Sequence, residues 1–171
     1  MAIRSNHYDA AFEAFLRAGR TPYVAVNEAR RALWGEASLK SLDFVVYSPT
    51  LGNLLIDVKG RLDAGPGCSA RRWENWATAD DLASLEQWQA IFGASFRALL
   101  VFGYQLPQPL TPNSLPEMLR FRERSYAFYG VWADDYRRAM KCRSPKWDTV
   151  WVPSPSYRAL RFSLATLGAA S

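Results

Sequence analysis

The pattern of apolar and polar residues changes its period along this chain, and it predicts two long helices. Residues 6–19 carry an apolar stripe at helical spacing, and Asn6 is suited to cap the first turn. Residues 79–92 carry a second apolar stripe, and Thr78 precedes Asp81 by three residues, a spacing typical of a helix-capping box. We therefore expect helices over 6–19 and 79–92.

Two apolar runs between these helices predict a β-hairpin. Residues 44–47 and 54–58 are almost wholly apolar, and the segment between them contains a proline, a glycine and an asparagine, as turns do. Strands that consist of continuous apolar runs are covered on both faces of their sheet. A strand is also expected at 21–26, a short helical connection at 27–34 and a long strand at 96–104.

The remainder of the chain predicts additions to this core. After a proline-rich connector at 106–116, the expected elements are strands at 125–132 and 149–152, a helix at 134–142 and a short last helix opened by Ser154. The tail after Leu164 is expected to fray.

These elements define an α/β fold class. We expect one domain over residues 1–171, with a mixed central sheet flanked by helices. Its core, at about 7–104, has the order helix, three strands, helix, strand (αβββαβ). The C-terminal extension, 105–171, adds strands and helices, and its strands can continue the same sheet.

The composition indicates a chain that can bury a sizeable core, since 49% of its 171 residues are hydrophobic and 22% are charged. No apolar run approaches the ~18 residues of a membrane span, and the N-terminus lacks the layout of a signal peptide. We expect a cytoplasmic protein with no membrane partner. Cys68 and Cys142 are isolated, without zinc-ligand spacing, and are expected to be ordinary semi-buried thiols.

The charge balance favours a polyanionic partner. The formal net charge is +5, and arginine heavily outnumbers lysine. Guanidinium groups contact phosphates bidentately and stack on bases, which suits nucleic acid. The residues that mark two other classes of enzyme are absent from the sequence. There is no glycine-rich phosphate loop, and the single histidine, His7, has no second histidine or cysteine with which to form a nucleophile dyad.

The predicted hairpin carries charges where apolar residues are expected. Asp43 stands at the start of the first strand, while Asp57 and Lys59 lie two positions apart near the end of the second and share one sheet face. A buried, unpaired charge costs several kcal/mol, so these groups must neutralise each other or bind a counterion. Two carboxylates and one ammonium leave room for a divalent cation.

Asp43, followed fourteen residues later by Asp57-Val58-Lys59, resembles the signature of the PD-(D/E)XK nuclease superfamily. The sequence departs from that pattern in two places, because Leu42 replaces a proline and Asp57 replaces the commoner glutamate. The resemblance implies a restriction-endonuclease-like core with these charges on its second and third strands. It covers about residues 7–104.

The resemblance also implies a metal site. Mg²⁺ or Mn²⁺ would be held by Asp43, Asp57 and the carbonyl of Val58, because hard cations prefer oxygen ligands. Lys59 would hold or help deprotonate the attacking water, while the cation would stabilise charge on the phosphodiester oxygens.

Further candidates for this site follow from the same resemblance. A glutamate on the first helix often joins it, and Glu13 is the matching residue, although it lies about 130° from the centre of the apolar stripe. A solvated Glu13 is the alternative, and Glu28 is its rival. Some branches place a glutamine on the second helix, for which Gln87 and Gln89 are candidates.

A segment after the hairpin combines arginine with tryptophan. In the predicted loop at 61–77, Arg71 and Arg72 stand beside Trp73 and Trp76. These side chains could hold phosphates and stack on bases. Alternatively, the tryptophans pin the loop to the core and the arginines lie in water.

The sequence therefore favours a metal-dependent nuclease that hydrolyses phosphodiester bonds, with DNA as the favoured substrate. The alternative is a non-catalytic nucleic-acid-binding module on the same fold. A third hypothesis is a structural α/β domain in which Asp57 and Lys59 merely pair at a strand edge. DNA or RNA, endonuclease or exonuclease action, and a homodimer all stay open at this point.

Overall fold

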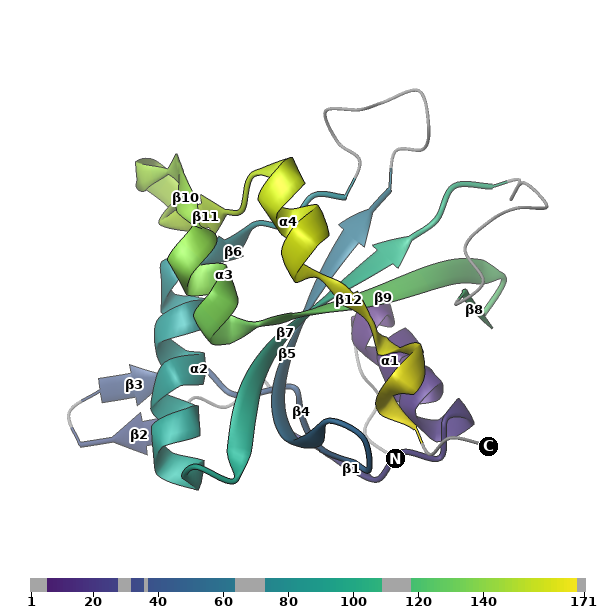
Figure 1. Ribbon diagram of the computed structural model, residues 1–171, viewed down its shortest axis with the longest axis horizontal. Helices are drawn as coiled ribbons and strands as arrows, with labels where there is room; N and C mark the ends of the chain where they lie inside the picture. The colour runs from purple at the N-terminus through teal and green to yellow at the C-terminus, as the bar shows by residue number, and fades with distance from the viewer. Residues whose placement is uncertain (1–5, 28–31, 36, 64–72, 109–117, 169–171) are drawn as a thin grey trace.

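The computed structural model describes residues 6–27, 32–35, 37–63, 73–108 and 118–168, and it shows a curved mixed sheet between helices (Figure 1). The helices are α1 (His7–Ala18), α2 (Ala79–Phe92), α3 (Ala133–Ala139) and α4 (Ser154–Leu160), with the 3₁₀ turns η2 (Pro145–Trp147) and η3 (Leu164–Leu167). The strands are β1 (Tyr23–Ala25), β2 (Ala32–Trp34), β3 (Ala37–Leu39), β4 (Phe44–Ser48), β5 (Gly52–Leu62), β6 (Ala77–Thr78), β7 (Phe96–Gln105), β8 (Leu119–Phe121), β9 (Arg124–Trp132), β10 (Lys141–Ser144), β11 (Thr149–Trp151) and β12 (Phe162–Ser163).

The main sheet has the strand order β1-β4-β5-β7-β9-β12, and β8 pairs with β9. Strands β4 and β5 form the antiparallel hairpin that the apolar runs predict. Strand β5 pairs with β7 in parallel, whereas β7 pairs with β9 antiparallel. The predicted mixed α/β architecture is therefore confirmed, and the order α1, β1, β4, β5, α2, β7 gives the expected core.

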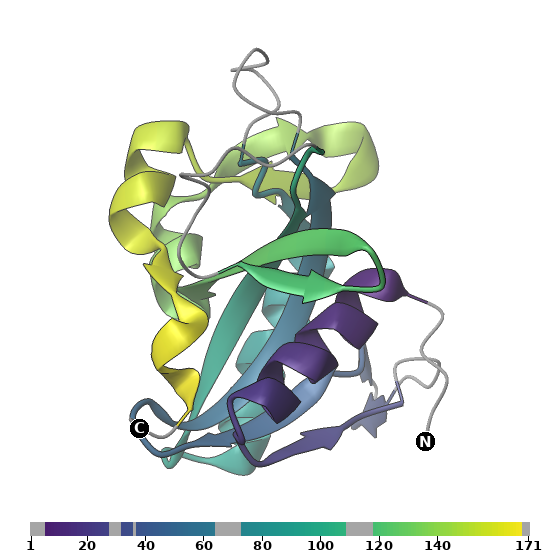
Figure 2. The same ribbon diagram turned by 90° about the vertical axis from the view of Figure 1, so that its right-hand side faces the viewer.

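Helix α1 covers one face of this sheet (Figure 2). Its start matches the prediction, because the side chain of Asn6 accepts a hydrogen bond from the Tyr8 backbone N–H at 3.0 Å. The aromatic side chains of its apolar stripe pack on alternate residues of β4 and β5. A Cβ at Gly60 of β5 would lie 2.1 Å from the ring of Tyr8, so only glycine allows the helix to approach this closely.

Helices α2 and α3 pack on the opposite face, where Val45, Leu55 and Leu100 are buried. The predicted capping box is confirmed, since the Thr78 hydroxyl accepts from the Asp81 N–H and the Asp81 carboxylate accepts from the Thr78 N–H. This box fixes the first turn of α2 against the end of β5. No helix among the described residues is long and apolar enough to cross a membrane.

A second sheet was not predicted. Strands β10, β11 and β6 form an antiparallel three-stranded sheet beside the main one (Figure 1). The prediction that 149–152 continues the main sheet is therefore wrong, whereas β9 does join it. The prediction of a helix through residue 142 is also wrong, because α3 ends at Ala139 and the next residues pair as β10 with β11.

Two further predictions need correction. Part of the helical connection expected at 27–34 is strand, because Ala32–Trp34 pairs with Ala37–Leu39 as a hairpin. The tail after Leu164 does not fray at once, since η3 buries Leu164 and Leu167 against the α1 face of the sheet. The apolar contacts of Leu164 and Leu167 hold η3 in place. The turn is too short for its sequence pattern to predict it.

Candidate active site

Asp43 and Asp57 lie close together on the central hairpin. The β4–β5 register begins with Phe44 opposite Ile56, and the N–H of Asp43, the residue before β4, donates to the same Ile56 carbonyl at 3.0 Å. The charge of Asp57 acts on Asp43, so the two carboxylates are neighbours. Asp43 is only 5% exposed, and its Oδ2 accepts a hydrogen bond from the Val58 N–H at 2.6 Å.

Lys59 connects this pair to α2. Its Nζ lies 2.8 Å from Asp57 Oδ2 and 3.0 Å from Asp81 Oδ2. Asp81 belongs to the capping box of α2, and its other oxygen accepts from Lys40 Nζ at 2.8 Å. Lys40 also donates to the Thr78 hydroxyl at 3.1 Å. The ammonium of Lys59 is therefore held from two sides, by its own strand and by the start of α2.

The carboxylates crowd one another. Burial, then repulsion by the charges of Asp57 and Asp9, raises the pKa of Asp43 well above its usual range, against the opposing effects of the Val58 N–H and Lys59. Burial also raises the pKa of Asp57, although Lys59 counteracts it. Burial is the main cause of both shifts, and the mutual repulsion of Asp43 and Asp57 adds to the shift of Asp43.

The two flanking ionic groups behave in the opposite way. Burial alone would lower the pKa of Lys59, but the charges of Asp57 and Asp81 raise it, so Lys59 keeps its proton at neutral pH. Burial alone would raise the pKa of Asp81, but Lys59, Lys40 and the Thr78 groups lower it to about 2. Asp81 is therefore a fixed negative charge behind the lysine.

Sequence reasoning missed Asp9 of α1. This carboxylate is 1% exposed, and it is the α1 acid whose charge acts most on Asp43. A helical signal for it existed, because Asp9 precedes Phe12 by three residues and Leu16 by seven, which puts it on the buried side of the helix. The resemblance drew attention to a glutamate instead.

Glu13, the predicted α1 candidate, has other partners. Its Oε1 accepts from Arg17 Nη2 at 2.9 Å and from the Tyr23 hydroxyl at 2.8 Å. Glu13 thus lies in an ionic contact along the helix surface and at the edge strand β1, as its position on the flank of the stripe suggests. The structure does not bring it to Asp43 and Asp57.

The two candidate glutamines of α2 do not contact Asp43 or Asp57. Gln89 Oε1 accepts from the Ala98 N–H at 2.7 Å at the far end of α2, and Gln87 is exposed. Glu28 lies outside the described residues. Cys142 is a free, exposed thiol, more open than an ordinary buried cysteine, and Cys68 lies outside the described residues.

Only part of the predicted arginine–tryptophan segment is described. Arg71 and Arg72 lie outside the described residues. The ring of Trp73 packs edge-on against Tyr104, with 4.9 Å between centroids, as a residue that pins the loop would do. Trp76 and Trp73 both line a surface pocket, so the nucleic-acid role predicted for this segment stays open for them.

The residues fit a hard divalent cation. We use the name charged cluster for Asp9, Asp43, Asp57, Asp81, Lys40 and Lys59. Its four carboxylates and two ammonium groups leave two negative charges. Within the described ranges no three Asp, Glu, His or Cys side chains converge into a ready metal cage. Mg²⁺ requires only one or two carboxylates, because waters complete its octahedron.

Val58 adds a further oxygen. Its N–H and its carbonyl leave the strand on the same side, the side on which the N–H reaches Asp43. If a cation bound between the two carboxylates, this carbonyl would offer it a neutral oxygen ligand. The donor set of the site is therefore composed of oxygens only.

A curved mixed sheet in this strand order, with helices on both faces, is a restriction-endonuclease-like fold. The fold that the resemblance implied is thereby confirmed.

A solved structure with this fold is that of Hjc, a Holliday junction resolvase from the archaeal hyperthermophile Archaeoglobus fulgidus. The TM-score is 0.53 and the identity 16%, and the match covers 93% of this chain and 95% of that chain. At this identity the likeness concerns the fold. No protein-family model and no curated protein matches the chain.

Proposed function

We propose that this protein is a divalent-metal-dependent nuclease that hydrolyses phosphodiester bonds in DNA. The observation that carries the proposal is the convergence of Asp43, Asp57 and Lys59 at the central hairpin. The fold is shared with a protein described as a Holliday junction resolvase, which supports DNA as the substrate.

The roles in the site follow from chemistry and charge. Asp43, Asp57 and the Val58 carbonyl would hold Mg²⁺ or Mn²⁺, and Asp9 would supply a further carboxylate from α1. When bound, the cation would stabilise negative charge on the phosphodiester oxygens. Without it, the excess negative charge of the charged cluster would repel a phosphate.

Lys59 acts as a proton-bearing group in this proposal. Its raised pKa keeps it an ammonium, which can bind a phosphate oxygen or orient a water molecule through its donors. Asp81 is a positioning residue, since it holds Lys59 from the side opposite Asp57. The capping box in turn fixes Asp81, so the start of α2 sets where the ammonium points.

The proposal is tested with purified protein and labelled four-way junction, single-stranded and duplex DNA, with Mg²⁺ or with EDTA. We expect cleavage of at least one substrate by the wild type with Mg²⁺ only. Asp57→Asn should abolish it, while Asp134→Asn, a change at an exposed acid of α3, should leave it within about twofold. Thermal melts of each variant check folding. Cleavage by Asp57→Asn at the wild-type rate would refute the proposed site.

A second candidate function is a nucleic-acid-binding module without catalysis. The observation in its favour is the position of Lys59 Nζ, which lies on the Asp57 carboxylate that would bind the cation. The same assay decides between the two, because a protein that binds DNA yet cuts no substrate with Mg²⁺ or Mn²⁺ would be the binding module.

A further inference from the structure

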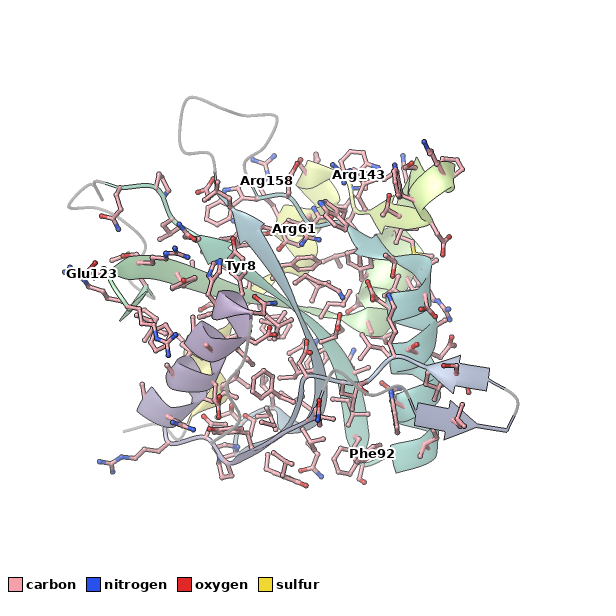
Figure 3. All side chains as sticks on the ribbon, turned by 180° about the vertical axis from the view of Figure 1, so that it is seen from behind. Tyr8, Arg61, Phe92, Glu123, Arg143 and Arg158 are labelled. Atoms are coloured by element: carbon pink, nitrogen blue, oxygen red, sulfur yellow. The ribbon has the colours of Figure 1, made fainter. Side chains whose placement is uncertain are left out.

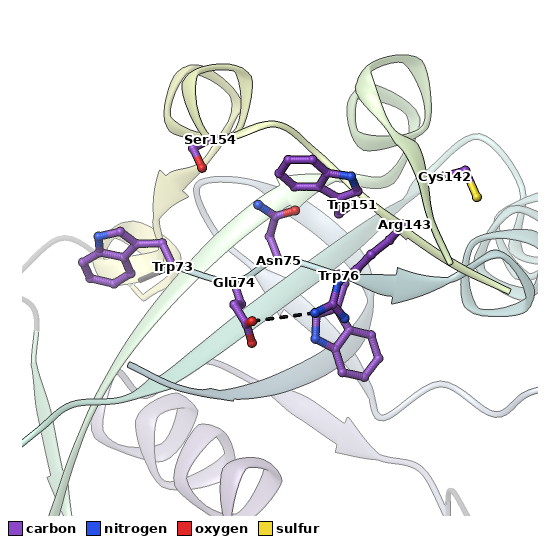
Figure 4. A pocket seen from close by; sticks show the side chains of 8 residues that line it. All are labelled: Trp73, Glu74, Asn75, Trp76, Cys142, Arg143, Trp151 and Ser154. Atoms are coloured by element: carbon purple, nitrogen blue, oxygen red, sulfur yellow. Dashed lines mark ion pairs between the residues drawn. The ribbon is translucent and has the colours of Figure 1, made fainter. Parts of the chain in front are cut away.

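A pocket with an unusual lining opens between the β6–β10–β11 sheet and α4. Its volume is about 360 Å³, within the range of small-molecule sites, and three of its walls are indole rings (Figure 4). We name it the tryptophan pocket and define it by Trp73, Glu74, Asn75, Trp76, Arg143 and Trp151. Arg143 and Trp151 come from the C-terminal extension, for which the sequence offered no role.

Strand β5 joins this pocket to the charged cluster. Asp57, Lys59 and Arg61 alternate along β5, so their side chains leave the same face of the sheet. The guanidinium of Arg61 lies 3.8 Å from the ring centroid of Trp76 and donates to the Trp76 carbonyl. Arg61 follows Lys59 by two residues on the same face and touches Trp76, a residue of the pocket wall, so it links the charged cluster to the pocket.

The floor of the pocket is rigid. Asn75 is buried, and its side chain donates to the Val152 carbonyl at 3.0 Å and accepts from the Val152 N–H at 2.8 Å. Two buried tyrosines hold the same backbone, because Tyr136 donates to the Asn75 carbonyl at 2.6 Å and Tyr104 to the Glu74 carbonyl at 2.9 Å. A site whose walls are already fixed loses little entropy when a ligand binds.

The backbone of Trp73, another lining residue, is strained. Its φ is 60°, in the left-handed region that side chains with a Cβ avoid, and such a conformation costs on the order of 1–3 kcal/mol. Contacts of its ring with Tyr104, Tyr129 and the Arg161 guanidinium hold it there. Trp73 therefore lines the pocket with an indole whose position these contacts fix.

Trp151 offers the open ring. Arg61 and Arg143 both lie over Trp76, the latter at 5.3 Å from the ring centroid, so that ring is already covered. Trp151 is 36% exposed although indoles are usually buried. An exposed ring with a guanidinium nearby is the arrangement on which bases of single-stranded nucleic acid stack.

The charges select a base rather than a phosphate for the pocket itself. Glu74 lies inside and would repel a phosphate, and it pairs with Arg143 only at 3.7 Å, a weak exposed contact. Arg143 is the arginine that lines the pocket, whereas Arg61 is buried against Trp76. Figure 3 shows Arg143 and Arg158 at one end of the molecule, opposite Phe92, and both are exposed, so they can contact the phosphates of a strand.

We propose that the tryptophan pocket binds an unpaired nucleobase of the DNA strand whose backbone passes the charged cluster, by stacking on Trp151. The choice of DNA as the occupant rests on the proposed nuclease function. In a duplex both faces of a base are covered by its neighbours, so only single-stranded or branched DNA presents a base to this pocket. The protein would then favour substrates with unpaired bases beside the cleaved phosphate.

The test measures binding without cleavage. Asp57→Asn protein in EDTA is titrated with a labelled oligothymidylate of about 20 nucleotides, longer than a typical single-strand site, and with a blunt duplex of the same length. Trp151→Ala and Arg143→Gln are added in the same background. The matched control is Trp147→Ala, which removes an indole that is 69% exposed on the same hairpin but does not line the pocket.

We expect Trp151→Ala to weaken oligothymidylate binding about tenfold or more, as the loss of one stacked base does, while duplex binding and the Trp147→Ala variant change less than about twofold. Arg143→Gln should weaken oligothymidylate binding and reduce its salt dependence. Equal affinity of Trp151→Ala and its parent for oligothymidylate, or equal losses for single strand and duplex, would overturn the proposal.

The result separates the pocket from the proposed nuclease. Loss of single-strand binding in Trp151→Ala, in a protein whose wild type cuts no DNA, would keep the pocket and refute the nuclease. Cleavage that requires Asp57, together with unchanged binding by Trp151→Ala and Arg143→Gln, would keep the nuclease and refute the pocket.

Discussion

The charged cluster and the tryptophan pocket lie along the same strand, β5, yet they are built in opposite ways. In the charged cluster, carboxylates and ammonium groups are largely buried and bound to one another and to the backbone. In the tryptophan pocket, an exposed indole and a loosely paired arginine face solvent above a fixed floor. The first arrangement positions reacting groups, whereas the second leaves surfaces free for a ligand.

The origin of the residues differs as well. The charged cluster draws on α1, the β4–β5 hairpin, the segment before it and the start of α2, which together are the core of the fold. The tryptophan pocket needs β10 and β11, which belong to the extension. When proteins of one fold act on many substrates, the residues of the shared core are expected to perform the chemistry. The added segments are expected to recognise the substrate. Changes in one region should therefore leave the function of the other intact.

Lys59→Met should have the largest effect. It removes the ammonium from between Asp57 and Asp81, and we expect cleavage to fall by about 10³-fold, as when a charge-stabilising donor is lost. Oligothymidylate binding in EDTA should change less than about threefold. Single-turnover cleavage and fluorescence anisotropy measure the two quantities. A variant that lost binding as severely as cleavage would break the separation of the two regions.

Asp9 and Glu13 sharpen the boundary of the charged cluster within α1. Asp9→Asn should lower cleavage about 10- to 100-fold, the range typical of changes around a metal centre, because its charge acts on Asp43. Glu13→Gln should stay within about threefold, since Glu13 bonds Arg17 and Tyr23. Initial rates across a range of Mg²⁺ concentrations check this. A larger loss of cleavage in Glu13→Gln than in Asp9→Asn would show that Glu13, and not Asp9, is the acid of α1 that acts in the site.

Asp81→Asn tests whether α2 positions the lysine. We expect about a tenfold fall in kcat with little change in KM, because Lys59 loses the partner opposite Asp57. Asp80→Asn is the matched control, since Asp80 is the exposed neighbour and lies 3.6 Å from Lys40.

The pH dependence of stability adds a readout for Asp81. Its pKa of about 2 lies below the usual value of ~3.9, so its stabilising effect is present above pH ~4 and is lost as the pH falls toward 2. Thermal melts should show Asp81→Asn less stable than the wild type at pH 7 and nearly equal to it near pH 2. A constant difference across this range would contradict the ionic role.

Asp43→Asn should have the smallest effect on the metal-free protein, and it should be stabilising. The raised pKa of Asp43 means that its ionised form is disfavoured in the fold, so stability falls as the pH rises through that pKa. An amide oxygen can still accept from the Val58 N–H. At pH 8 in EDTA we expect Tm to rise by about 2–4 °C, corresponding to about 1 kcal/mol in a chain of this size.

The same variant should respond less to metal. Wild-type protein should gain stability when Mn²⁺ is added at pH 8, and Asp43→Asn should gain much less. At pH 4 the Tm advantage of Asp43→Asn should disappear, because the wild-type carboxyl is then protonated. A lower Tm for Asp43→Asn at pH 8 in EDTA would show that the carboxylates do not crowd one another.

The charged hairpin was predictable because its signals are local. Two apolar runs and a turn define β4 and β5, and the two-residue period puts Asp57 and Lys59 on one face. Helix α2 was equally clear, since its capping box and apolar stripe lie within one short segment.

The remainder depends on contacts that join distant parts of the chain. The β6–β11 pairing joins residues Ala77 and Val150, and no local pattern shows which strands will meet. Lys40, in an irregular segment, reaches Asp81 only because the two elements pack together. Asp9 was missed for another reason. The family resemblance implied a glutamate on this helix, so the position of Asp9 on the buried side of the helix was not considered.

The most direct test of the account is anomalous diffraction from crystals of wild-type and Asp57→Asn protein soaked in Mn²⁺. We expect one Mn²⁺ peak between the carboxylates of Asp43 and Asp57 in the wild type and none at that position in Asp57→Asn. A Mn²⁺ peak found only elsewhere on the wild-type protein, with these two carboxylates unliganded at saturating Mn²⁺, would contradict it.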